Sequence, residues 1–243
     1  MIAANLGFLW KDLPLTERIA RAKSAGFDAV ELHDDAQGQV EAVHAALETA
    51  GLPLLGLNAH MGATAGCAGI PEMERQARAD IDSAVEAARA LGGTGVHVLA
   101  GVVPDSAKAW DTYQANLSYA CERAEGLTVL IEPLCEAAKP GYLLSTMERA
   151  AEVIGEVGTP NLRAMFDVFH VAGAGADVVE SYRRHAGIVG HVQIADPLTR
   201  GEPSGLGDTV RSLREAGYDG ALGAEYVPSE AVEDGLGWME EVR

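Results

Sequence analysis

A short unit that ends a helix at a glycine and then starts a strand recurs along this 243-residue chain. It reads AGFD at 25–28, AGLP at 50–53 and AGYD at 216–219. Strand-like apolar runs and helical periodicity alternate eight times, a pattern typical of parallel sheets. No G-x-G-x-x-G follows the first strand and no Walker sequence occurs, which disfavours a nucleotide-binding doubly wound sheet. The chain is therefore predicted to form one α/β domain over residues 1–243, a (β/α)8 TIM barrel.

The expected elements follow from the spacing of apolar residues and from glycine and proline breaks. We expect strands at 2–6, 29–32, 54–58, 96–99, 128–131, 164–167, 190–193 and 221–225. We expect helices at 16–24, 40–50, 71–91, 107–125, 178–185, 210–216 and 232–242, and one that reaches 154 after a capping box at 145–148.

Four of the expected strands end in a side chain that carries an oxygen ligand. The run TVLIEP at 128–133 is apolar up to Glu132 and then stops at a proline, as expected of a strand buried on both faces. Asp167, Gln193 and Glu225 end three later strands in the same way. Buried carboxylates are costly unless they are paired or bound to a cation. Because active sites of such barrels lie at the carboxyl ends of the strands, we expect these four side chains to share one site.

Three carboxylates and one amide oxygen form a ligand set that suits Mg²⁺ or Mn²⁺, and Co²⁺ also accepts such ligands. The alternative is that each acid pairs with a lysine or arginine at the rim. Two glutamates that face each other across a metal suit proton transfer between neighbouring carbons, while the metal holds the substrate oxygens and stabilises an enediolate. This chemistry supports aldose–ketose isomerisation or epimerisation. Loss of one such acid should slow the reaction by about 10²–10⁴-fold.

Segments spread over nearly the whole chain resemble one family. They are AANL at 3–6, AGFDAVE at 25–31, VHVLAG at 96–101, HVQIA at 191–195 and GLGW at 235–238. They are similar to the hydroxypyruvate isomerase family of xylose-isomerase-like barrels. The resemblance implies interconversion of hydroxypyruvate and tartronate semialdehyde (2-hydroxy-3-oxopropanoate). It also implies Glu132 and Glu225 as the acid–base pair, and Glu132, Asp167, Gln193 and Glu225 as ligands of a divalent metal.

The chain departs from the family pattern in two segments of the expected rim. LHDDAQG at 32–38 stands where many members have an aromatic and proline-rich segment, and NAHMG at 58–62 stands where a proline-containing loop is common. Both segments would shape the substrate pocket, so a 2-oxo-tetronate, the substrate of a close relative within the family, is the first alternative. A ketose 3-epimerase, an endonuclease of the same broad barrel class and a barrel that binds a ligand without turnover are further alternatives. An endonuclease would need several histidine ligands for zinc and a basic groove.

Four other side chains are candidates for binding the substrate. Lys139 and Arg200 lie in segments that resemble the family, and each could grip a substrate carboxylate, Arg200 through two parallel hydrogen bonds. His170 lies three residues after Asp167 and could contact the substrate or orient a metal ligand. His60 lies in the second divergent segment.

Composition limits the expected partners and location. The chain has 18 basic and 36 acidic residues, a net charge of −18, whereas nucleic acid and anionic membranes attract clustered Lys and Arg. We therefore expect neither as a partner, but a small anionic hydroxy-oxo acid that a metal, Lys or Arg would receive. Three cysteines without a CxxC pair, no signal peptide and no membrane-length apolar run indicate a cytoplasmic protein. A homo-oligomer, dimer or tetramer, is expected from the resemblance alone.

Overall fold

The computed structural model describes residues 1–243 and has a closed barrel of eight parallel strands at its centre. The strands follow one another around the barrel in chain order, and β1 pairs with β8 to close it. This confirms the predicted (β/α)8 architecture. The strands are β1 (Ile2–Asn5), β2 (Ala29–Leu32), β3 (Leu54–Asn58), β4 (Gly95–His97), β5 (Thr128–Ile131), β6 (Leu162–Asp167), β7 (Val189–Ile194) and β8 (Leu222–Ala224).

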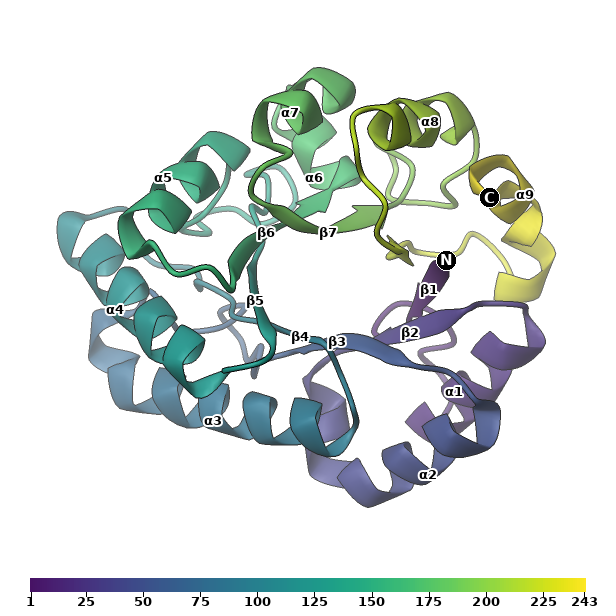
Figure 1. The fold of residues 1–243 in the computed structure, drawn as a ribbon, viewed down its shortest axis with the longest axis horizontal. Coiled ribbons are helices and arrows are strands. Elements are labelled where there is room, and N and C mark those ends of the chain that lie inside the picture. Colours follow the sequence, from purple (N-terminus) through teal and green to yellow (C-terminus); the bar gives the residue numbers. More distant parts are fainter.

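Helices form a ring outside the strands, and the two ends of the chain meet where the barrel closes (Figure 1). The α-helices are α1 (Leu15–Ser24), α2 (Val40–Ala50), α3 (Glu74–Ala90), α4 (Ala107–Arg123), α5 (Met147–Val157), α6 (Val168–Gly173), α7 (Val178–His185), α8 (Gly207–Glu215) and α9 (Met239–Val242). Three 3₁₀ helices are η1 (Asp34–Gln39), η2 (Pro71–Met73) and η3 (Val232–Trp238). No helix combines the length and the apolar character needed to cross a lipid bilayer.

The recurring glycine ends helices as the sequence predicts. Gly51 has a φ of +60° at the end of α2, and its N–H donates to the carbonyls of Leu47 and Glu48. A residue with a side chain would be strained in this left-handed conformation. Because α2 ends at this glycine, β3 begins only three residues later, at Leu54. The helix-ending glycine unit therefore sets where the strand after it begins.

The strands match their expected ranges to within two residues at either end, whereas one helix was missed and one expected helix is wrong in type over most of its length. The missed helix is α6, which begins directly after β6 because the Asp167 side chain accepts a hydrogen bond from the backbone N–H of Phe169. The expected closing helix at 232–242 is a 3₁₀ helix up to Trp238 and an α-helix only from Met239. Gly235 and Gly237 lie in that segment, and glycine disfavours the α-helix by about 1 kcal/mol relative to alanine.

Candidate active site

The side chains expected to form a site lie together at the carboxyl end of the barrel. Glu132 directly follows β5, Asp167 ends β6, and Glu225 directly follows β8. Gln193 lies in β7, where it pairs in register with Asp167. All four residues are only 2–6% exposed. The fold therefore buries three carboxylates and one amide at one end of the barrel.

Two of these carboxylates and one histidine lie in an arrangement that a metal ion could use. Glu132, Asp167 and His170 each offer one ligand atom, and the three atoms lie within 4.8 Å of one another. His170 Nε2 is 3.9 Å from Glu132 Oε1 and 3.8 Å from Asp167 Oδ2. Both of these oxygens, and Gln193 Oε1, are buried without a hydrogen-bond partner. Unpaired buried oxygens of this kind fit a hard divalent cation, because otherwise each carries an uncompensated desolvation cost.

Arg200 reaches into this cluster from the loop after β7. Its Nη2 donates to Glu225 Oε2 and lies 3.7 Å from Asp167 Oδ2, and its Nη1 is 3.1 Å from His170 Nε2. The guanidinium lies over the Phe8 ring, with Cζ 4.7 Å from its centroid. Glu225 is therefore paired with an arginine, as in the alternative considered above for acids at the rim. Glu132 has no such arginine partner.

This pairing displaces the pKa values of the two glutamates in opposite directions. Burial, together with the charges of Glu225 and Asp167, raises the pKa of Glu132 well above its usual value. Burial also acts on Glu225, but the adjacent Arg200 guanidinium, His33 and His170 together outweigh it and lower the pKa of Glu225 to about 2. Burial raises the pKa of Asp167 to about 7. Two carboxyl groups whose environments separate their pKa values are the arrangement that acid–base catalysis uses.

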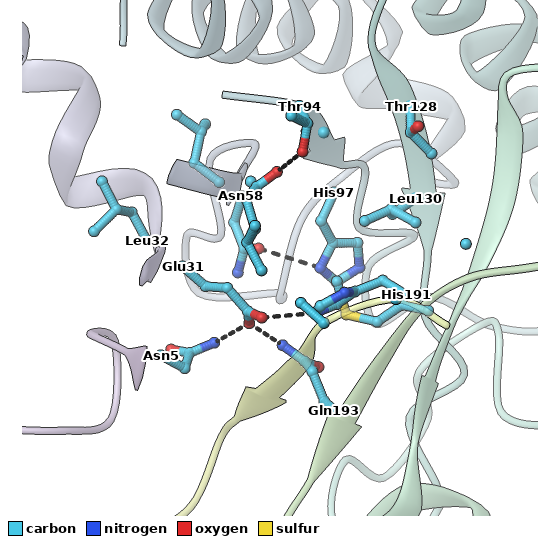
Figure 2. Close-up of a pocket in the computed structure, with 18 of the residues that line it drawn as sticks. Asn5, Glu31, Leu32, Asn58, Thr94, His97, Thr128, Leu130, His191 and Gln193 are labelled. Atoms are coloured by element: carbon cyan, nitrogen blue, oxygen red, sulfur yellow. Dashed lines mark hydrogen bonds and ion pairs between the residues drawn. The ribbon is translucent and has the colours of Figure 1, made fainter. Parts of the chain in front are cut away.

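A polar layer around Glu31 lies inside the barrel (Figure 2). Glu31 on β2 is at its centre, and Asn5, His191 and Gln193 all contact its carboxylate. A cavity of about 180 Å³ adjoins this layer and extends to Thr94 at the amino-terminal side of the strands. Glu132, Asp167 and Glu225 do not line this cavity. It is therefore a space in the barrel interior and not the place where a substrate would meet these carboxylates.

Two further histidines, His97 and His191, lie in the barrel interior. His97 Nδ1 is 3.3 Å from Asn58 Oδ1 and 3.8 Å from Glu132 Oε2, and burial lowers the pKa of His97 to about 4. His191 Nε2 is 2.6 Å from Glu31 Oε1, and this carboxylate raises the pKa of His191 in spite of burial.

The remaining substrate-binding candidates lie on loops at the same end of the barrel. His60, in the loop after β3, is exposed, and its Nδ1 is 2.7 Å from Asp34 Oδ2. Lys139 is half-buried in the loop after β5, and Lys108 is the only lysine of the molecule in an ion pair. Lys139 therefore has an ammonium group that no carboxylate holds, whereas His60 is already engaged.

One feature of the site, the placement of His170, was not evident from the sequence. His170, considered as a contact for substrate, lies on α6 with its Nε2 between Glu132 and Asp167. Its other ring nitrogen, Nδ1, faces the backbone N–H and the Sγ of Cys135, at 3.2 and 3.5 Å. The sequence signal that could have located it is the capping role of Asp167, which starts the helix that carries the histidine.

Comparisons with known proteins agree with this architecture. Residues 19–242 match a family model described as the xylose isomerase-like TIM barrel. A 2-oxo-tetronate isomerase from Cupriavidus necator is 34% identical, with 98% of this chain and 96% of that protein aligned. A putative hydroxypyruvate isomerase from Streptomyces coelicolor is 36% identical over 93% of this chain and 90% of that protein. A human protein with the same name is 33% identical over 98% and 93%.

Solved structures with the same fold carry several different names. A crystal structure described as an AP endonuclease, family 2, from Brucella melitensis has a TM-score of 0.95 and 29% identity, covering 100% of this chain and 98% of that one. A 3-keto-D-glucoside 4-epimerase from E. coli has a TM-score of 0.83 at 22% identity, with 98% of each chain covered. The second likeness supports the fold alone, because barrels of one fold host unrelated reactions.

Proposed function

We propose that this chain, which belongs to the xylose isomerase-like TIM barrel family, is a metal-assisted isomerase of a short hydroxy-oxo acid. Hydroxypyruvate, interconverted with tartronate semialdehyde, is the leading substrate, and a four-carbon 2-oxo-tetronate is the alternative. The names of relatives that are at least 30% identical over nearly the whole chain support this class of reaction. Within the site, the proposal depends on one observation: Glu132, Asp167 and Glu225 are buried together at the carboxyl end of the barrel, and Glu132 Oε1 and Asp167 Oδ2 have no hydrogen-bond partner.

The two glutamates would divide the proton transfers between them. Glu225 is ionised, and it would take a proton from the carbon next to the substrate carbonyl once Arg200 has moved from it to the substrate carboxylate, because the paired guanidinium keeps its pKa at about 2 and makes it a weak base. Glu132, with its pKa raised, holds a proton that it can give to the neighbouring carbon. Removal of the first proton produces an enediolate, and delivery of the second at the other carbon completes the isomerisation.

A divalent cation, Mg²⁺ or Mn²⁺ with Co²⁺ as a further option, fits the donors of the cluster. Glu132, Asp167, Gln193 and Glu225 would hold it, and the unpartnered buried oxygens of the first three support this assignment. Such a cation supplies Lewis-acid stabilisation of negative charge on the substrate oxygens. His170, with Nε2 less than 4 Å from two of the ligand oxygens, would help to orient either the ligands or the substrate.

A carboxylate on the substrate is favoured by the cations at this end of the barrel. Arg200 offers the two parallel donors of a guanidinium, and Lys139 offers an ammonium group without an ion-pair partner. A free ketose would have no carboxylate for either group to bind, which disfavours a ketose 3-epimerase. His60 would contribute only if the substrate drew it away from Asp34.

A nucleic acid substrate is the second candidate to weigh, because one similar structure is described as an AP endonuclease. With 36 acidic and 18 basic residues, the chain lacks the positive charge that attracts a phosphate backbone. The cluster contains a single histidine beside oxygen donors, which suits Mg²⁺ or Mn²⁺ better than a zinc cluster. We therefore favour a small organic anion over DNA.

The test is a substrate panel in D₂O with added Mn²⁺, comprising hydroxypyruvate, 2-oxo-tetronates and free ketoses. We expect turnover and deuterium incorporation with an acid substrate, and loss of both in Glu132→Gln and Glu225→Gln with the circular dichroism spectrum unchanged. Glu136→Gln, which changes an exposed glutamate four residues beyond Glu132, is the matched control and should stay active. Turnover of ketoses alone would refute an acid substrate, and absence of deuterium uptake from every compound would favour a non-catalytic barrel.

A further inference from the structure

The Glu31 carboxylate lies inside the barrel and is contacted by three side chains from two strands, Asn5 of β1 and His191 and Gln193 of β7. Only 5% of the Glu31 residue is exposed to solvent. Glu31 Oε2 accepts from Gln193 Nε2 at 2.8 Å and from Asn5 Nδ2 at 3.2 Å, and Oε1 faces His191 Nε2 at 2.6 Å (Figure 2). Both carboxylate oxygens are therefore engaged, and none of the contacts is to solvent.

The contact with Gln193 determines which atom of that amide is left for the cluster. A carboxylate can only accept hydrogen bonds, so the amide must turn its nitrogen toward Glu31. The reversed amide would place two acceptor oxygens against each other at hydrogen-bond distance. Gln193 Oε1 consequently lies on the free side of the amide, where it is buried and has no partner. Oxygen, and not nitrogen, is what a hard divalent cation requires of this residue.

Asn5 links the Glu31 carboxylate to the Glu225 carboxylate. Asn5 Nδ2 donates both to Glu31 Oε2 and to Glu225 Oε1, at 3.2 and 3.0 Å. Its Oδ1 accepts from the backbone N–H of Gly7 at 3.0 Å, which fixes the orientation of the Asn5 amide. Glu31 is therefore linked by one hydrogen bond to Gln193 and by two to Glu225.

Glycine at position 223 makes room for this arrangement. A Cβ atom at Gly223 would lie 2.1 Å from Glu31 Oε1, so any other residue would push the carboxylate aside. Gly223 pairs in register with Gln193 on the neighbouring strand, at the level where the contact forms. The Glu31 side chain thus crosses the barrel from β2 toward β7 over a strand that carries no side chain there.

We propose that Glu31 is a positioning residue of the metal site: it orients the Gln193 amide so that oxygen faces the cation, and through Asn5 it holds Glu225. This inference rests on the proposed metal-assisted function. Glu31 touches neither substrate nor cation in this assignment. Residues that orient metal ligands in this way typically change metal affinity by about 10–100-fold when they are removed.

Two substitutions separate orientation from charge and from packing. Glu31→Gln keeps an oxygen acceptor for Gln193 and Asn5, and its amide nitrogen can donate to a neutral His191. Glu31→Met keeps the volume but removes both acceptors, which releases the Gln193 amide to rotate. We expect Mn²⁺ affinity, measured by titration calorimetry on chelator-treated protein, to fall about 10–100-fold in Glu31→Met and to stay within about 3-fold of wild type in Glu31→Gln.

Asn116→Leu is the matched control, because Asn116 is an equally buried amide that bonds Ala68 O far from the cluster. It should leave the affinity unchanged. Gly223→Ala, which displaces the Glu31 carboxylate, is a second test should Glu31→Met fail to fold, and it should also weaken Mn²⁺ binding at least about 10-fold. Equal affinities in Glu31→Met and wild type would overturn the inference alone, as would equal losses in Glu31→Met and Glu31→Gln. Absence of Mn²⁺ binding by wild type would overturn the proposed function and this inference with it.

Discussion

Replacement of Arg200 by methionine should change the binding of a metal and of a substrate in opposite directions. The Arg200 guanidinium contacts Glu225, Asp167 and His170, which are the groups that a cation in the cluster would approach. A cation and the guanidinium cannot both use these atoms, so metal binding in wild type includes the cost of moving Arg200 away. Methionine removes the positive charge but retains a chain that can pack against Phe8.

The size of the effect follows from the burial of the pair. Removing one partner of a buried ion pair typically costs about 3–5 kcal/mol, and Arg200, with 18% of its side chain exposed, belongs near the lower end. If a bound cation relieves about half of a 3 kcal/mol penalty, its affinity rises about 10-fold, since 1.4 kcal/mol corresponds to a factor of 10. A substrate carboxylate would lose a charge-assisted pair worth about 1.5–3 kcal/mol, so KM should rise about 10–100-fold.

Titration calorimetry with Mn²⁺ and steady-state kinetics on the same preparation measure the two effects. Arg123→Met is the control, because it breaks an arginine–carboxylate ion pair, with Asp82, that lies on the outer helices and is more exposed. It should alter neither Mn²⁺ affinity nor KM. Weaker or unchanged Mn²⁺ binding in Arg200→Met would refute the competition between guanidinium and cation, and an unchanged KM would refute a role in holding the carboxylate.

Two further predictions concern packing and the rim. Gly66→Ala should destabilise the protein by at least about 2 kcal/mol in urea unfolding, because the new Cβ would lie 2.4 Å from the Leu99 carbonyl oxygen. Gly126→Ala is the control, because Gly126 has the same φ of +84° but nothing within 4 Å of the new Cβ, and it should cost only about 1 kcal/mol. A smaller loss for Gly66→Ala than for Gly126→Ala would contradict this packing argument. Lys139→Met should leave the unfolding midpoint unchanged, because Lys139 is in no ion pair, but should raise KM for the acid substrate; an unaltered KM would remove Lys139 from the site.

The barrel and the positions of the strand-end acids could be predicted because both depend on local patterns. Strands buried on both faces are short apolar runs, and the recurring glycine stop locates the start of three of them. Once the strands are placed, parallel topology brings their carboxyl ends together without further information. Glu132, Asp167 and Glu225 therefore follow from the sequence alone.

The position of Arg200 could not be predicted, because it depends on the path of a loop and on residues far apart in the chain. Arg200 has a φ of +58°, unusual for a residue with a side chain, after a turn in which the Asp196 side chain accepts from the N–H groups of Leu198 and Thr199. Phe8, which follows β1 near the other end of the chain, supplies the ring over which the guanidinium lies. No spacing rule relates such positions.

The charges of the cluster also predict how metal binding depends on pH. Glu132, Asp167 and Glu225 oppose one guanidinium, so full ionisation leaves two negative charges, which one divalent cation would neutralise. Without the cation, bound protons reduce this negative charge, because the pKa of Glu132 is raised and that of Asp167 is about 7. Because these carboxyl groups hold protons in the folded state that they would lose on unfolding, the metal-free protein should lose stability as pH rises from about 4 to about 7, by up to about 1.4 kcal/mol per pH unit for each group.

Asp167 must lose its proton to bind Mn²⁺, so binding should release about one proton more at pH 6 than at pH 8, where Asp167 is already ionised. Calorimetry in two buffers of different ionisation enthalpy counts the protons at each pH. Asp167→Asn should remove the difference between the two values, because it removes the group that titrates between them. Equal proton release at pH 6 and pH 8 in wild type would mean that the buried carboxylates are balanced by some charge other than the protons assigned to them.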